Sequence, residues 1–242
     1  MSGESFLSIE NATRRFAGLV AVDGVSFRLA RGEILSMIGP NGAGKTTMFN
    51  LITGQLAPTA GTILFRGERI EKLPPHVRAR RGMGRTFQIA KPLVGLTTRE
   101  NVMVGAFLRH RRHGHAFDRA DAVLDEVGLG RRAEVPAGEL TLSERRRLEI
   151  ARALALSPEL VLLDEVMAGL NATEVTDVIE LVRRLNARGI TFLVIEHNLK
   201  VVRALSGRVI VLDYGAKLAE GTASEVLSDP RVVKAYLGKR AG

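Results

Sequence analysis

Residues 38–47 read IGPNGAGKTT, and this stretch decides the fold class. It follows the apolar run EILSM at 33–37 and precedes the helical segment MFNLITG at 48–54, so the pattern G-x-x-x-x-G-K-[ST] lies between a strand and a helix. Its glycines are Gly39, Gly42 and Gly44. They let backbone N–H groups point at phosphate oxygens, while Lys45 would reach the terminal phosphates and Thr46 would ligate Mg²⁺. The stretch predicts nucleotide binding, and a glycine-rich turn without a ligand is the alternative.

A second acidic element is the apolar run LVLLDE at 160–165. As a strand it would deliver Asp164 and Glu165 at its carboxyl end, where ligands gather in open parallel sheets. Asp164 would hold Mg²⁺, directly or through water, and Glu165 would orient and deprotonate the attacking water. Strands also end in acidic residues for solubility alone. Together with the phosphate loop, the pair favours hydrolysis over binding alone.

Two further polar residues close apolar runs. His197 follows ITFLVIE at 190–196, and Gln88 ends GRTFQ at 84–88. Each has an ordinary alternative, a hydrogen-bonded boundary histidine or a surface glutamine. The phosphate loop and the acidic strand elsewhere in the chain favour a functional role for both residues.

Composition sets the broad class of the protein. A chain of 242 residues, 45% of them hydrophobic and 25% charged, can bury a sizeable core. It contains no cysteine, which excludes disulfides and thiol chemistry and makes the cytoplasm the default compartment. Apolar runs such as LVLL at 160–163 are far shorter than the roughly 18 residues that span a bilayer, and no signal peptide is evident. We expect a globular protein that does not cross a membrane by itself.

The formal net charge of +9 comes largely from local clusters: RARR at 78–81, RHRRH at 109–113 and RRR at 145–147. No aromatic residues are interleaved in the way that would stack nucleic-acid bases. Solvated helix faces are therefore the favoured interpretation of these clusters. A functional basic surface is the alternative.

The order of the segments indicates one domain with an insertion. Short apolar runs fill the first third, a helical texture covers about 92–157, and apolar runs then alternate with amphipathic helices, notably at 173–188. The last pattern is typical of a parallel sheet covered on both faces. We expect a single domain over 1–242, with a core at about 1–91 and 158–242 and a helical part at about 92–157.

These motifs resemble those of the ATP-binding cassette ATPases over nearly the whole chain. GPNGAGKTT is similar to the family's phosphate loop, Gln88 to its Q-loop glutamine, LVLLDE to its magnesium and catalytic-glutamate strand, and His197 to its switch histidine. The resemblance implies an α/β fold: a P-loop NTPase (RecA-like) parallel-sheet core, an N-terminal antiparallel β subdomain and an inserted α-helical subdomain. It also implies ATP and Mg²⁺ as cofactors, with Mg²⁺ held by Thr46, Gln88 and Asp164.

Further nucleotide contacts follow from the same resemblance. The nucleotide would lie on the loop residues Gly39, Asn41, Gly42, Ala43, Gly44, Lys45, Thr46 and Thr47. Phe16 is placed to stack on adenine, with a core-packing phenylalanine as the alternative. Asn171, in AGLN, matches a loop that touches the other subunit of a dimer.

The stretch LTLSE at 140–144 occupies the place of the family signature LSGGQ and departs from it at four of five positions. Its helix start would face the terminal phosphate of ATP bound by the partner subunit, with Thr141 and Ser143 near that phosphate. Because Thr141 and Glu144 are three residues apart, we expect a capping box between them. The arginines at 145–147 are expected to face solvent, since Leu148, Ala151 and Leu154 form the apolar stripe.

Within the family, three segments look most like those of the ATPases of branched-chain amino-acid importers: RTFQ, AGLN and the C-terminal EGTASEVLSDPRVVKAYLG. The alternatives are the ATPase of lipopolysaccharide extraction and a soluble ATPase acting on nucleic acid. The importer interpretation implies transmembrane permease subunits, a homodimer or heterodimer with a second ATPase, and an external solute-binding protein, with no nucleic acid. The chain would lie on the cytoplasmic face of the membrane, and apolar groups near Ile89, Pro92 and Leu93 would dock the permease.

Overall fold

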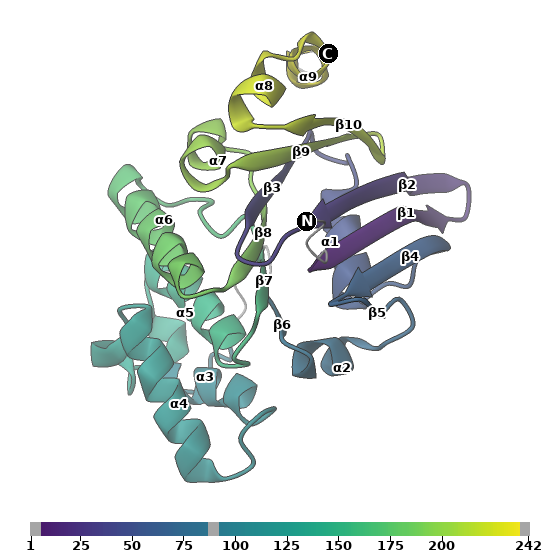
Figure 1. The fold of residues 1–242 in the computed structure, drawn as a ribbon. Coiled ribbons are helices and arrows are strands. Elements are labelled where there is room, and N and C mark those ends of the chain that lie inside the picture. Colours follow the sequence, from purple (N-terminus) through teal and green to yellow (C-terminus); the bar gives the residue numbers. More distant parts are fainter. Residues whose placement is uncertain (1–5, 87–91, 238–242) are drawn as a thin grey trace. The chain divides into compact units, whose positions relative to one another are not determined.

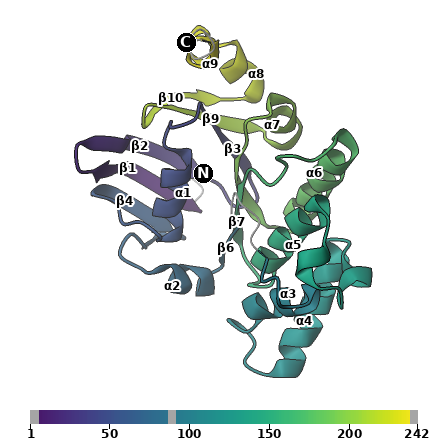
Figure 2. The same cartoon turned by 180° about the vertical axis from the view of Figure 1, so that it is seen from behind.

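The computed structural model describes residues 6–86 and 92–237. The chain forms two compact units, one of residues 1–78 and 191–242 and one of residues 79–190. Each unit is built around its own strands (Figures 1 and 2). Gln88 and Ile89, which the sequence placed in the site and in the docking surface, lie outside the described residues.

The first unit contains an antiparallel sheet in the order β2 (Leu19–Leu29), β1 (Leu7–Phe16), β4 (Ala60–Phe65), β5 (Glu68–Arg69). The register between β1 and β2 runs from Leu7 opposite Leu29 to Phe16 opposite Leu19. Leu7 and Leu29 have no solvent exposure, so this end of the hairpin is anchored in the core. The other end delivers Phe16 to the surface, where it is 39% exposed.

The first unit also contains strands in the order β10 (Ala216–Gly221), β9 (Arg208–Asp213), β3 (Ile34–Ile38), β8 (Thr191–Ile195). Strand β3 is parallel to both of its neighbours, and β10 is antiparallel to β9. The apolar runs read from the sequence form these strands, and their side chains are almost entirely buried. Helix α1 (Lys45–Thr53) begins soon after β3, while α7 (Leu199–Leu205), α8 (Ala223–Ser228) and α9 (Pro230–Leu237) complete the unit.

Arg78 corrects the expectation that the first basic cluster is a solvated face. This arginine, in α2 (Pro75–Arg80), is 1% exposed. Its guanidinium donates to the carbonyl oxygens of Leu51 at 2.6 Å and Ile52 at 2.7 Å, near the end of α1. The last carbonyls of a helix lack partners within it, so the arginine is buried where it satisfies them. Burial lowers the pKa of Arg78 to about 10.

The second unit pairs β6 (Met83–Arg85) in parallel with β7 (Leu160–Asp164). Its helices are α3 (Thr98–Ala106), α4 (His113–Glu126), α5 (Leu142–Leu154) and α6 (Ala172–Ala187), with short 3₁₀ turns η1 (Gly130–Arg132) and η2 (Ala137–Glu139). Helix α3 packs on both α4 and α5. The segment expected to be helical therefore contains three α-helices, and the helix expected near 173–188 is α6. None of the helices in the described ranges is long and apolar enough to span a membrane.

Candidate functional site

The phosphate loop between β3 and α1 depends on two glycines. Gly39 has φ 151° and Gly44 has φ 98°. A Cβ atom on Gly39 would lie 2.1 Å from the carbonyl oxygen of Leu212, and one on Gly44 would lie 2.4 Å from that of Ala21. Both distances are far below van der Waals contact, so neither position accepts a side chain. The neighbouring backbone therefore fixes the path of the loop.

The start of α1 is open to an anion. Gly44 is its N-cap, no side chain caps the helix, and its first turn holds no acidic residue. The first N–H groups of a helix have no partner within it and carry partial positive charge. This arrangement suits a phosphate group. Asn41, Gly42 and Thr46 are exposed, Thr47 is partly exposed and Ala43 is buried.

Lys45 is folded back on its own loop. Its Nζ donates to the carbonyl oxygens of Gly39 at 2.7 Å and Pro40 at 3.0 Å, and the residue is 8% exposed. The ammonium group is therefore held at the loop in a largely buried position. Phosphate oxygens entering the loop would meet this charge without a large movement of the side chain.

His197 lies at the same edge of the sheet as the phosphate loop. Strands β3 and β8 are parallel and place Met37 opposite Ile195. Gly39 and His197 each follow two residues after these partners, and His197 is exposed. The carboxyl ends of parallel strands meet at one edge of a sheet, which explains why His197 and the phosphate loop share this edge.

Phe16 ends β1 with its ring 39% exposed, so the core-packing alternative is wrong. The guanidinium carbon of Arg14 lies 4.5 Å from the ring centroid. The ring thus already stacks against one planar group, in a cation–π arrangement. It has the exposure that a platform for a planar base needs.

In the second unit, Asp164 is the last residue of β7 and is 1% exposed. Its Oδ2 accepts from Nη2 of Arg85 at 3.2 Å, and its backbone N–H donates to Oγ1 of Thr86 at 3.0 Å. Glu165 follows with φ 50°, a left-handed conformation that is uncommon for a residue with a side chain. Sequence reasoning gave Arg85 and Thr86 no role, although both belong to the GRTFQ motif that drew attention to Gln88.

The capping box expected at LTLSE is confirmed. The N–H of Glu144 donates to Oγ1 of Thr141 at 3.2 Å, and the N–H of Thr141 donates to Oε2 of Glu144 at 2.9 Å. The other carboxylate oxygen of Glu144 lies 3.0 Å from Nε of Arg132, a partner that the sequence did not indicate. Thr141 is exposed, whereas Ser143 is 9% exposed. Glu144 is therefore turned back on its own helix and paired with a cation.

The expectation that the three arginines of α5 face solvent is wrong for Arg146. This residue is 8% exposed, lies 3.7 Å from the carboxylate of Glu149 and donates to the carbonyl oxygen of Ala168 at 3.5 Å. Position 146 is three residues after the buried Ser143 and four before the buried Ile150, so it lies on the same helix face. The buried face of α5 is thus wider than its apolar residues alone indicate.

Asn171 begins α6 as its N-cap. Its side chain accepts from the N–H of Glu174 at 3.0 Å, and the carboxylate of Glu174 accepts from the N–H of Asn171 at 3.0 Å. A second capping box therefore shapes this loop. It orients the segment that the family resemblance assigns to the dimer interface.

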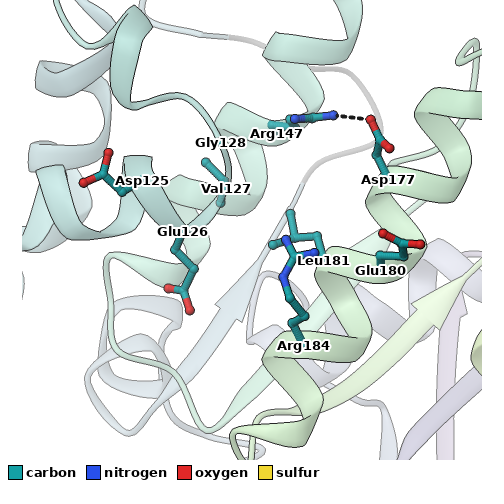
Figure 3. A pocket seen from close by; sticks show the side chains of 9 residues that line it. All are labelled: Asp125, Glu126, Val127, Gly128, Arg147, Asp177, Glu180, Leu181 and Arg184. Carbon is teal, nitrogen blue, oxygen red and sulfur yellow. Dashed lines mark hydrogen bonds and ion pairs between the residues drawn. The ribbon is translucent and has the colours of Figure 1, made fainter.

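A cavity of about 200 Å³ opens in the second unit between the end of α4, α5 and α6 (Figure 3). It is lined by Asp125, Glu126, Val127, Gly128, Arg147, Asp177, Glu180, Leu181 and Arg184. An ion pair of 2.8 Å joins Arg147 to Asp177 across it. Its four carboxylates outnumber its two guanidinium groups, so it would repel a nucleotide phosphate.

Comparison with known proteins agrees with this geometry. The family model described as "ABC transporter" matches residues 22–168, and the model described as "Branched-chain amino acid ATP-binding cassette transporter" matches residues 216–242. The chain is 41% identical to the high-affinity branched-chain amino acid transport ATP-binding protein BraF of Pseudomonas aeruginosa, covering 96% of this chain and 98% of that protein. It is 40% identical to LivG of Escherichia coli K12, which has the same description, with coverage of 98% and 99%.

The lipopolysaccharide export ATP-binding protein LptB of Escherichia coli K12 is 35% identical, with coverage of 96% and 97%. Among solved structures, a nucleotide-free ATP-binding cassette from an ABC transporter superposes with a TM-score of 0.89 at 32% identity, covering 96% of this chain and 98% of that one. A dimeric post-hydrolysis state of an ATP-binding cassette bound to ADP and Pi gives 0.81 at 27% identity, with coverage of 90% and 98%. The predicted α/β fold of the P-loop NTPase type is confirmed by these structures.

Proposed function

The chain belongs to the ATP-binding cassette family of ABC transporters, and from this premise we propose that it is the ATP-hydrolysing, energy-coupling subunit of an importer for branched-chain or related amino acids. The observation that carries the proposal is the phosphate loop. Gly39 and Gly44 lie close to backbone carbonyls that leave no room for a side chain, and α1 starts without a side-chain cap. The Lys45 side chain is hydrogen-bonded to the loop itself. The match of residues 216–242 to the branched-chain amino acid family supports the substrate class.

The residues divide the chemistry of hydrolysis among themselves. Lys45 would exchange its two carbonyl partners for oxygens of the terminal phosphates, and the backbone from 41 to 47 would cradle the rest. Phe16 would stack on the adenine, and His197 would contact the terminal phosphate from the edge of the sheet. Glu165 would orient the attacking water and accept its proton.

Thr46, Asp164 and Gln88 would hold the magnesium ion. Hydroxyl, carboxylate and amide oxygens are the ligands that Mg²⁺ prefers, and the buried carboxylate of Asp164 already attracts a cation, Arg85. When bound, Mg²⁺ neutralises charge on the phosphate oxygens. The donor set therefore fits the ion.

The partners follow from the same proposal. The chain would act on the cytoplasmic face of the membrane as one half of an ATPase dimer, homomeric or heteromeric, that drives transmembrane permease subunits. An external solute-binding protein would deliver the solute to the permease. Thr141 and Ser143 would face the terminal phosphate held by the other ATPase subunit, and Asn171 would lie at the dimer interface. The dimeric, ADP-bound relative supports this assembly.

The two alternatives have less support. The lipopolysaccharide-export relative is less similar, at 35% identity against 41% for the branched-chain amino acid relative. The nucleic-acid alternative rested on basic clusters, and Arg78 and Arg146 of those clusters are buried with protein partners. The importer therefore explains more of the molecule.

The decisive experiment replaces Glu165 by glutamine. We expect ATP binding to persist and steady-state hydrolysis to fall by about 10² to 10⁴-fold, the usual effect of removing a general base. Glu180→Gln, the same chemical change at an exposed residue of α6, is the matched control and should retain normal turnover. Unchanged hydrolysis in Glu165→Gln would remove the catalytic assignment. Uptake of labelled leucine by proteoliposomes that contain the chain and its co-purified permease tests the substrate class.

A further inference from the structure

A buried ion pair in the second unit joins the GRTFQ motif to the LVLLDE motif, and the proposed function does not explain this connection. Arg85 ends β6 and Asp164 ends β7, and the side chains of this pair are 9% and 1% exposed. Nη2 of Arg85 lies 3.2 Å from Oδ2 of Asp164. The pair is therefore largely shielded from water, unlike an ion pair on the surface.

Backbone contacts hold the two partners in place. Strands β6 and β7 are parallel and place Arg85 opposite Leu162. Thr86 donates its N–H to the carbonyl oxygen of Leu162 at 2.9 Å and accepts from the N–H of Asp164 at 3.0 Å through its hydroxyl. The approach of the arginine to the carboxylate is thus set by the strands themselves.

The physical role of such a pair is to compensate a buried charge. A buried carboxylate without a counter-charge is strongly disfavoured, and a well-placed guanidinium offsets that penalty. The proposed function gives Asp164 a second cation, Mg²⁺, at the same carboxylate. Two cations at one carboxylate repel each other, so each lowers the affinity of the other.

We propose that Arg85 is a positioning residue that serves as the counter-charge of Asp164 in the metal-free protein, and that a divalent cation arriving with the nucleotide competes with it. This inference rests on the proposed function, because it takes Asp164 to be a metal ligand. By linkage, occupancy of the metal site weakens the hold of Arg85 on Asp164 to the same extent that Arg85 weakens metal binding.

The test measures cation affinity rather than turnover. Binding of Mn²⁺ with a non-hydrolysable ATP analogue is followed by electron paramagnetic resonance in the full chain and in Arg85→Met, which keeps a long side chain and removes the charge. We expect the affinity for Mn²⁺ to rise about five- to tenfold, the lower end of ordinary coupling between two sites. Arg85→Lys keeps the charge and should stay close to the wild-type affinity. Turnover should fall in Arg85→Met, because the carboxylate loses its fixed position.

Two controls isolate the effect. Arg99→Met removes another ion-paired arginine of the same unit, whose partners are Asp121 and Glu134, and should leave Mn²⁺ affinity unchanged. In an Asp164→Asn background the Arg85→Met change should have no further effect on Mn²⁺ affinity, because the shared carboxylate is gone. Arg85→Gln supplies the neutral variant if Arg85→Met does not fold.

The outcomes separate the inference from the function. Unchanged or weakened Mn²⁺ affinity in both neutral variants overturns the competition, and an equal rise in Arg99→Met does the same. Failure of the wild-type chain to bind the metal–nucleotide complex would instead overturn the proposed function, and the inference with it.

Discussion

Replacing Thr141 by alanine removes one half of the capping box at the start of α5. The lost hydrogen bond is the one that Thr141 Oγ1 accepts from the N–H of Glu144 at 3.2 Å. Loss of an N-cap side chain costs about 0.5 to 2 kcal/mol of helix stability. If the helix start binds the phosphate of the partner subunit's ATP, this cost appears as roughly 2- to 30-fold weaker ATP-driven dimerisation. Binding of ATP to the monomer should change much less, because that nucleotide lies on the phosphate loop.

A second, independent variant tests the charge of Glu144 by removing its ion-pair partner, Arg132. Its carboxylate lies 3.0 Å from Nε of Arg132, where Coulomb's law with the dielectric constant of water gives about 1.4 kcal/mol. The Arg132 side chain is 39% exposed and that of Glu144 is 23% exposed, so solvent screening reduces the contribution of the ion pair to roughly 0.2 to 1 kcal/mol. Arg132→Ala should therefore weaken dimerisation only a few-fold, and more strongly at low salt.

Glu144→Gln distinguishes a role of this charge from a role of helix stability. Glutamine completes a capping box as glutamate does, but it carries no charge to neutralise. In the Arg132→Ala background, Glu144→Gln should restore dimerisation. If Arg132 only stabilises the helix through packing, the double variant will remain as weak as Arg132→Ala.

The assay is analytical ultracentrifugation against ATP concentration in the Glu165→Gln background, where the dimer is expected to accumulate. Ser143→Asp is added as a variant that places a carboxylate at the helix start. Arg131→Ala, an exposed neighbour of Arg132 in the same 3₁₀ turn, is the control and should have no effect. If Thr141→Ala and Ser143→Asp both dimerise with the ATP dependence of Glu165→Gln alone, the start of α5 does not face phosphate.

Two further changes test the other parts of the proposal. Lys45→Ala removes a charged hydrogen-bond donor to phosphate and should weaken ATP binding roughly 10- to 150-fold in a fluorescent-nucleotide titration, and a normal titration would contradict its role. Leu93→Glu, at a residue that is 42% exposed beside Pro92, should uncouple hydrolysis from transport in proteoliposomes, whereas loss of ATP binding by the isolated chain would make this segment structural.

Short sequence patterns predicted the phosphate loop, the capping box and the strands, because each of these depends on residues that are close together in the sequence. The phosphate loop follows from glycine spacing, because a left-handed turn against neighbouring carbonyls admits no side chain at positions 39 and 44. The capping box at Thr141 follows from a spacing of three residues. The strands follow from short apolar runs, which form buried parallel pairs.

The arginines could not be placed in this way, because tertiary contacts decide whether a long cationic side chain is buried. Arg78 is buried because the end of α1 supplies carbonyl acceptors from a distant part of the chain. Arg146 is buried against Glu149 and a loop carbonyl, and Arg85 against Asp164. In the sequence, each of them is one member of a basic run or a neighbour of a motif. Apart from Glu149, which lies on α5 with Arg146, the acceptors named here come from other segments of the chain.

The start of α5 has a capping box, a motif that recurs at other helix starts of the described chain. Helices α3, α5, α6 and α8 each begin with a capping box in which a glutamate stands three residues after the cap. Glu144 therefore belongs to a motif that recurs at four helix starts of the described chain. Helix α1 is the contrast, because it has neither a side-chain cap nor an acidic residue in its first turn, as suits the start of a helix proposed to bind phosphate. The proposal that the start of α5 faces a second phosphate therefore needs a counter-charge for Glu144, and Arg132, 3.0 Å away, is placed to supply it.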